Sequence, residues 1–137
     1  MADPFVLAHV RRLPLVARLN PQQIEWVADV TQILRYGPGE VMYRQGDVPP
    51  GLFMFISGSG TLIQRGSDGV DRPFGQVATN EFINENALFS PVPSPLTLTI
   101  AETSIVMFLG TQQFQSALAY HPDLKAAITP TTPIDGN

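Results

Sequence analysis

The first third of the chain places apolar residues at helical spacing behind two helix-start signals. Asp3-Pro4 and Asn20-Pro21 each set a capping residue before a proline, and Gln23 stands where it completes a capping box. An apolar stripe with helical period follows over residues 24–30. We therefore predict that residues 1–34 form an N-terminal helical segment of the same domain.

From residue 35 onward, glycines divide the chain into short runs of β-type residues. Ser67-Asp68-Gly69 is a hairpin signal between two of these runs. Strands at this regular pitch predict a mainly β fold, an eight-stranded β-roll or jelly-roll barrel over residues 35–110. The β-type runs that are expected to contribute strands include Val41-Met42-Tyr43, Leu52–Ile56, Thr61–Gln64, Phe74–Val77 and Leu96–Leu109. The residues expected in the barrel core are Tyr43, Phe53, Met54 and Phe55.

A helical pattern returns at the end of the chain. Thr111 is placed to cap a helix over residues 111–128, with Phe114 and Leu118 facing inward. Pro122 is expected to stop or kink this helix. Residues 129–137 are polar and contain proline, which is typical of a tail or a linker stub.

Composition narrows the class of protein. The chain has 137 residues, 44% of them hydrophobic and 15% charged, which fits one packed domain. A net charge of -4 gives no basic surface for direct nucleic-acid binding. No apolar run reaches membrane-spanning length, and the amino-terminal residues lack a signal-peptide pattern. We therefore expect a soluble cytoplasmic chain without membrane contact.

The sequence offers little for catalysis or metal binding. There is no cysteine, and His9 and His121 are too few and too far apart for a multi-histidine metal site. No serine has a base partner in the local sequence, and no phosphate-loop or dinucleotide motif occurs. We expect no enzymatic activity, no catalytic residue, no metal and no cofactor.

Residues 82–100 have the outline of a phosphate-binding cassette. The helical run Glu85–Phe89 precedes a loop with three prolines in six residues, and then a strand. A helix start presents unpaired backbone N–H groups and suits an anion. No lysine or arginine occurs between Arg72 and Lys125, however, so a phosphate here would lack a cation from the cassette itself.

The order of helices, glycine-punctuated strands, cassette and closing helix is a recognisable combination. The chain resembles the cyclic-nucleotide-binding domain family, which includes the catabolite activator protein and protein-kinase regulatory subunits, over residues 5–128. The segments that carry the resemblance are Tyr36-Gly37-Pro38-Gly39-Glu40-Val41, Arg44-Gln45-Gly46-Asp47, Gly51-Leu52-Phe53, Ile56-Ser57-Gly58, Glu81-Phe82, Glu85 with Ala87-Leu88, Phe114 and His121-Pro122.

The resemblance implies roles for cassette residues. In the family, a Gly-Glu-x-Ala-Leu segment binds the cyclic phosphate through the glycine and helix-start amides, and the ribose 2′-hydroxyl through the glutamate. An arginine farther on, followed by a small residue, pairs with the phosphate. Asn84 stands in the glycine place, Pro95 or a close neighbour in Ser94-Pro95-Leu96 in the arginine place, and Thr97 in the small-residue place. The candidate ligand-binding residues are Glu85, Asn84, Asn86, Ala87, Leu88 and Thr97.

Several of these residues have a structural alternative. Glu85 either contacts a ribose or only meets the helix dipole in the first turn. Asn84 and Asn86 either line a polar pocket or cap the helix, and capping is the favoured role. Thr97 and Thr99 alternate with leucine and isoleucine, so they face either the interior or the solvent, and solvent is favoured.

The sequence thus predicts a non-enzymatic regulatory or sensor domain with weak or lost cAMP and cGMP binding. Losing one partner of a buried charge pair costs about 2–5 kcal/mol. The alternatives are a working cyclic-nucleotide sensor of a transcription regulator or another signalling protein, and a scaffold or dimerisation module. Expected partners are a cyclic nucleotide or another small ligand, and a partner domain or a second copy contacted through the helices.

Overall fold

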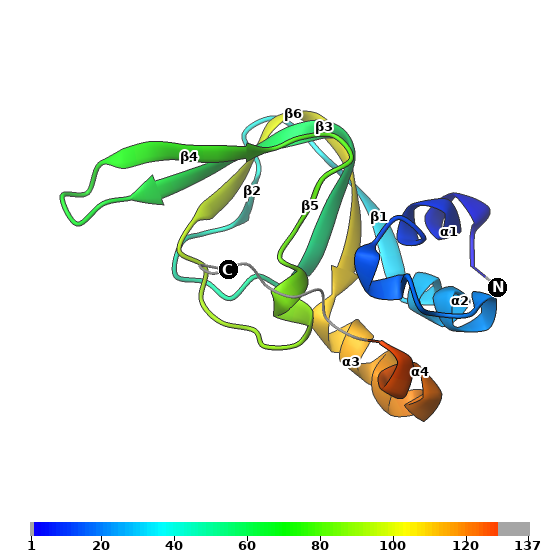
Figure 1. The fold of residues 1–137 in the computed structure, drawn as a ribbon. Coiled ribbons are helices and arrows are strands. Elements are labelled where there is room, and N and C mark those ends of the chain that lie inside the picture. The colour runs from blue at the N-terminus through cyan, green and yellow to red at the C-terminus, as the bar shows by residue number, and fades with distance from the viewer. Residues whose placement is uncertain (1, 129–137) are drawn as a thin grey trace.

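The computed structural model describes residues 2–128 as an antiparallel sheet with helices gathered at one end (Figure 1). In chain order the elements are α1 (Pro4–Val10), η1 (Pro14–Val16), α2 (Pro21–Asp29), β1 (Thr31–Tyr36), β2 (Val41–Tyr43), β3 (Gly51–Arg65), β4 (Asp71–Val77), β5 (Phe82–Ile83), η2 (Glu85–Leu88), β6 (Thr97–Gly110), α3 (Thr111–Tyr120) and α4 (Pro122–Ala127). The predicted tail at 129–137 lies outside the described residues.

The sheet is built on two long strands. Its order is β1-β6-β3-β4, with β2 paired to β6 and β5 paired to β3. The mainly β antiparallel class is therefore confirmed. The closed eight-stranded barrel is wrong, because the described residues form a six-stranded sheet whose order ends at β1 and β4 without closing.

The difference in strand number has a local cause in β3. Leu52–Ile56 and Thr61–Gln64 were expected as separate strands, but both belong to this one strand of 15 residues. Gly58, with φ of +84°, sits where the pairing to β6 shifts register between Phe55 and Gly60. These bulges bend the strand without ending it. The predicted turn at 67–69 is confirmed as the tip of the hairpin between β3 and β4.

Both predicted helix starts are confirmed at the amino-terminal end. The Asp3 carboxylate accepts a 2.7 Å hydrogen bond from the backbone of Phe5. Asn20 and Gln23 form the reciprocal capping box of α2. The helical segment ends earlier than predicted, since residues 31–34 already belong to β1 and pair with β6.

The carboxyl-terminal helix is divided at Pro122. The expected stop at Pro122 is confirmed: within the predicted range 111–128, α3 and α4 are separate helices that meet at His121. The predicted Thr111 cap is wrong. Gly110 holds the N-cap position, and the Thr111 hydroxyl donates instead to the Ala87 carbonyl oxygen at 2.8 Å.

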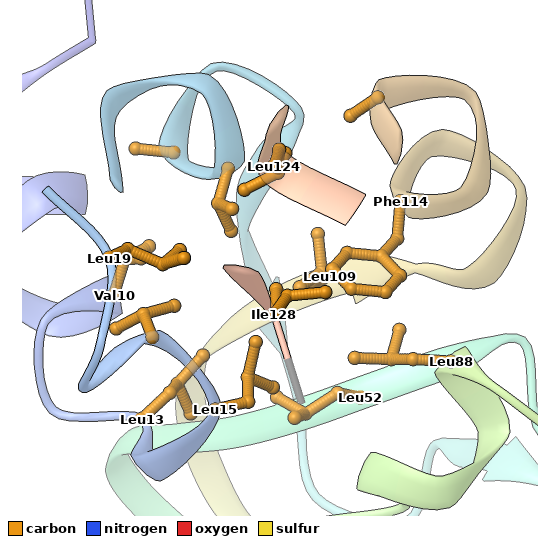
Figure 2. Packing of buried hydrophobic residues seen from close by; sticks show 14 of the residues in the cluster. Val10, Leu13, Leu15, Leu19, Leu52, Leu88, Leu109, Phe114, Leu124 and Ile128 are labelled. Carbon is orange, nitrogen blue, oxygen red and sulfur yellow. The ribbon is translucent and has the colours of Figure 1, made fainter. Parts of the chain in front are cut away.

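The larger core cluster joins the helices to the end of the sheet that carries η2 (Figure 2). Leu88 of η2 and Phe114 of α3 are both fully buried in it. Leu118 is also buried there, as predicted. The four predicted barrel-core residues are all buried, divided between this cluster and a second one inside the curved sheet.

Candidate ligand-binding site

Asn84 makes the tight corner between β5 and η2. Its backbone is left-handed, with φ of 70° and ψ of 33°. Asparagine adopts this conformation more readily than other side-chain-bearing residues, although glycine does so at lower cost. The residue that replaces the expected family glycine therefore keeps a glycine-type backbone and adds a polar side chain.

Asn84 holds the N-cap position of η2, as predicted, but its side chain makes no capping hydrogen bond. Its oxygen accepts a 2.6 Å hydrogen bond from the Tyr43 hydroxyl. Tyr43 is 6% exposed, and this burial is the main cause that raises the pKa of its hydroxyl to about 12. The pair is therefore neutral at physiological pH and satisfies a buried donor within the protein.

The proline-rich loop before β6 is fixed to the turn that follows β2. Ser94 exchanges two backbone hydrogen bonds of 2.8 Å with this turn, accepting from Gly46 and donating to Asp47. Its side-chain hydroxyl, also buried, bonds both backbone polar groups of Leu96. These bonds, together with the fixed φ of three prolines, define the position of the loop beside η2.

A cavity of about 190 Å³ lies between η2 and this loop. None of the residues lining it, all within the described part of the chain, is lysine or arginine. Arg12 instead donates to the Asn80 side chain, and Arg44 lines a different groove. The lining residues are Tyr43, Pro49, Ile83, Asn84, Asn86, Ala87, Val92, Pro93, Ser94, Pro95 and Leu96.

The structure brings only some of the candidate residues together at this cavity. Asn84, Asn86 and Ala87 line it. Leu88 is fully buried in the core below it. Glu85 is half-buried in the first turn of η2, a position that both of its proposed roles require.

Thr97 lies away from the cavity. Its strand neighbour Leu98 is fully buried, so the threonine points to the other face of β6. The Thr97 hydroxyl accepts a 2.9 Å hydrogen bond from the backbone of Gln45. The solvent-side orientation of this threonine was the favoured alternative, and the structure agrees with it.

Among the lining residues that were not sequence candidates, Tyr43 and Ser94 carry polar side chains. Tyr43 was assigned only to the core, and Ser94 only to the run in the arginine place. The sequence feature that could have pointed to Tyr43 is its hydroxyl, because the hydroxyl of a buried tyrosine usually has a hydrogen-bond partner. The signal for Ser94 is its place in the run that should hold an arginine; of that run it is the most buried member, while Pro95 is exposed.

The cassette is tied directly to α3. The Thr111 hydroxyl and the Gln115 side-chain amide donate to backbone carbonyl oxygens of η2. The rings of Phe89 and Phe114 meet edge to face, with centroids 5.4 Å apart. A displacement of η2 would therefore be transmitted to α3 through side chains that contact both.

Neither a metal centre nor a membrane helix is found in the part of the chain that the structure describes. Within residues 2–128, no three histidine, aspartate or glutamate side chains are grouped to hold a metal ion. No helix in that range combines the length and the apolar character needed to cross a bilayer.

Comparison with known proteins decides the family. A family model described as "Cyclic nucleotide-binding domain" matches residues 33–121, more than half of the chain. The chain belongs to the cyclic nucleotide-binding domain family. The resemblance drawn from the sequence motifs is thereby confirmed.

Members of the family with related sequences include kinase regulators. A cAMP-dependent protein kinase regulatory subunit from Blastocladiella emersonii is 26% identical over 117 residues, which make up 85% of this chain and 29% of that protein. The chain thus spans less than a third of the length of the curated relatives that it matches.

Solved structures share the fold. The N-terminal domain of a transcriptional regulator from Streptomyces coelicolor A3(2) is 26% identical, with a TM-score of 0.75 over 87% of this chain and 85% of that one. The regulatory subunit of a cAMP-independent protein kinase A from Trypanosoma brucei is 16% identical, with a TM-score of 0.68 over 88% of this chain and 44% of that one. The second likeness is one of fold.

Proposed function

We propose that this chain is a regulatory domain of the cyclic nucleotide-binding family whose affinity for cAMP and cGMP is weak or lost. The observation that carries the proposal is the cavity beside η2, which is lined without a lysine or arginine. A cyclic phosphodiester buried there would keep its negative charge without a cationic partner. Missing one partner of such a pair costs about 2–5 kcal/mol, or roughly 1.5 to 3.5 decades in Kd.

Two features of the cavity support this proposal further. Asn84 fills the corner where the family glycine lets the phosphate approach the backbone, and its side chain is already bonded to Tyr43. The cavity volume of about 190 Å³ is also below the roughly 300–1,000 Å³ of pockets that hold drug-sized ligands. Both favour a small uncharged ligand, or none, over a nucleotide.

The regulatory part of the proposal depends on the connection between the cassette and α3. The hydrogen bonds from Thr111 and Gln115, together with the Phe89–Phe114 contact, join η2 to this helix. A small ligand or a protein contact that shifts η2 would move α3, and α3 would pass the shift to a partner domain. We assign the chain no catalytic step.

A thermal-shift screen tests the proposal. The screen compares cAMP, cGMP and a set of uncharged small molecules with hydrogen-bonding groups. A ligand at 100 times its Kd stabilises the folded state by about 2.7 kcal/mol, which is a readily measured shift in melting temperature. We expect no shift with either cyclic nucleotide; a clear saturable shift with cAMP or cGMP would overturn the proposal.

A working nucleotide sensor of a transcription regulator is the second candidate. The observation in its favour is the likeness to the transcriptional-regulator domain from Streptomyces coelicolor, together with Glu85 in the family position for the ribose contact. Calorimetry distinguishes the two functions. Saturable micromolar cAMP or cGMP binding that Glu85→Ala abolishes would establish the second.

A further inference from the structure

A second hollow lies on the outer face of the sheet and shares no lining residue with the cassette cavity. It has a volume of about 750 Å³ and is found between the turn after β2 and the tip of the β3–β4 hairpin, which projects from the body of the domain (Figure 1). We call it the outer groove; it is lined by Val41, Arg44, Gln45, Ile63, Arg65, Gly66, Ser67, Asp71, Thr97 and Thr99.

Strand pairing gives the groove a defined floor. Thr97 and Thr99 alternate along β6 with the buried residues Leu98 and Ile100, so both hydroxyls belong to the outer face. In the ladder Thr97 pairs with Ile63 of β3. The floor is therefore a patch of hydroxyl and methyl groups carried by the central strands of the sheet.

Gln45 fixes one wall to that floor. Its side-chain oxygen accepts a 2.7 Å hydrogen bond from the backbone of Arg65, and its side-chain amide donates to the Arg65 carbonyl oxygen at 3.1 Å. Its own backbone N–H donates to the Thr97 hydroxyl at 2.9 Å. The turn is thus attached to both β3 and β6 by hydrogen bonds within the protein.

The charges at the groove do not cancel. Arg65 and Asp71 form an ion pair at 2.7 Å. The hydrogen bond between them raises the pKa of Arg65 and lowers the pKa of Asp71, so both stay charged. Neither of the two ion pairs among residues 2–128 includes Arg44. The lining itself therefore has two guanidinium groups against one carboxylate. The Asp47 carboxylate, which is outside the lining, accepts from the Arg44 backbone N–H at 3.4 Å and is not in an ion pair with the Arg44 guanidinium.

The hydroxyl groups of the lining can donate hydrogen bonds to a bound acceptor. The Thr97 oxygen already accepts from Gln45, so its O–H proton is left to donate. Thr99 and Ser67 supply further hydroxyls, and the only lining carboxylate, Asp71, is bonded to Arg65. A surface rich in donors with one excess positive charge suits an acceptor-rich anion.

We infer that the outer groove binds a small oxyanion of the phosphate or carboxylate class, with Arg44 as its charged partner and the hydroxyls of Thr97 and Thr99 as donors. The methyl groups of Val41 and Ile63 provide room for a short apolar part in a carboxylate ligand. The groove shares no lining residue with the cassette cavity, so anion binding in it does not depend on whether that cavity binds a nucleotide.

Titration of the isotope-labelled chain by NMR tests this inference. Inorganic phosphate and acetate are added in separate titrations at constant ionic strength, with chloride as the reference anion. We expect saturable shifts of the amide signals of Thr97, Thr99 and Gly66. In Arg44→Gln, Kd should rise about 10-fold or more, since a hydrogen bond to a charged group is worth one to two decades.

Two further variants complete the test. Arg18→Gln removes an exposed arginine far from the groove in sequence and should leave Kd unchanged. Asp71→Asn should lower Kd, because it releases the Arg65 guanidinium for the anion. Shifts that are absent with both anions, or that persist unchanged in Arg44→Gln, would overturn the inference; equal weakening by Arg18→Gln would show general charge attraction instead.

Discussion

The Tyr43 hydroxyl donates a 2.6 Å hydrogen bond to the side-chain oxygen of Asn84, which is itself in a left-handed backbone conformation. The two residues come from β2 and from the corner before η2, and both line the cavity. The bond links the backbone geometry of the cassette to the buried end of β2. Because the Asn84 side-chain oxygen accepts this bond, it is already paired within the protein where a ligand in the cavity would contact it.

Substitutions at Asn84 should separate the backbone requirement from the hydrogen bond. Asn84→Ala loses the bond and places an alanine at φ of 70°, so we expect a destabilisation of about 2–4 kcal/mol. Asn84→Gly loses the same bond without the backbone cost and should be about 1 kcal/mol more stable than the alanine variant. Urea denaturation measures both; a glycine variant no more stable than the alanine variant contradicts the account.

The buried Tyr43 hydroxyl predicts a stability loss at alkaline pH. Burial raises its folded-state pKa to about 12, whereas the unfolded value is about 10. The contribution of the protonated Tyr43 hydroxyl to the free energy of unfolding is complete below pH 10. It is lost as pH rises toward 12, because the unfolded chain releases this proton first. The slope from this group is at most about 1.4 kcal/mol per pH unit.

Tyr43→Phe is the control for the alkaline effect. The variant should lose that part of the pH slope in denaturation series between pH 9 and pH 12. An ultraviolet titration of tyrosinate should likewise lose one late-ionising group. An identical slope in the variant and the parent chain would assign the effect to other residues.

Phe114 should carry much of the attachment between the cassette and α3. It is fully buried and its ring meets the Phe89 ring edge to face. It belongs to the same core cluster as Leu88 (Figure 2). Phe114→Ala should cost about 3–5 kcal/mol of unfolding free energy. The matched control is Phe74→Ala in β4, a phenylalanine that is 63% exposed, which should change stability by no more than about 0.5 kcal/mol.

Two glycines with the same backbone conformation should respond differently to alanine. Gly39 and Gly58 have φ of +87° and +84°, but a side chain at Gly39 would meet nothing within 4 Å. At Gly58 it would lie 2.6 Å from the Thr103 carbonyl oxygen. Gly39→Ala should cost about 1–2 kcal/mol, the backbone cost alone. Gly58→Ala should cost clearly more in thermal denaturation, and equal costs would contradict the bulge geometry of β3.

Much of the fold was predictable because its signals are local. The capping residues Asp3 and Asn20 bond backbone groups two and three residues farther along the chain. The hairpin turn at 67–69 likewise depends only on neighbouring residues. The strand number was not predictable. In the sequence, Gly58 is typical of a strand end. The segments before and after it form one strand only because both pair with β6.

The candidate site was predictable only in part, for a similar reason. Asn84 was identified because its neighbours fix the motif, and its left-handed backbone fits the glycine place. Its partner Tyr43 lies 41 residues earlier, and no local pattern joins the two. Ser94 could not be separated from Pro95 by sequence, since the difference is one of burial.

Calorimetric titration of cAMP into two chains, the parent and the double variant Asn84→Gly/Ser94→Arg, tests the central claim most directly. Position 94 is buried and lines the cavity, so an arginine placed there would enter it. We predict no saturable micromolar binding by the parent chain, and a gain of roughly 30-fold or more in affinity in the double variant. Micromolar binding by the parent chain, equal to that of the variant, would contradict the claim that the missing cation removes the nucleotide.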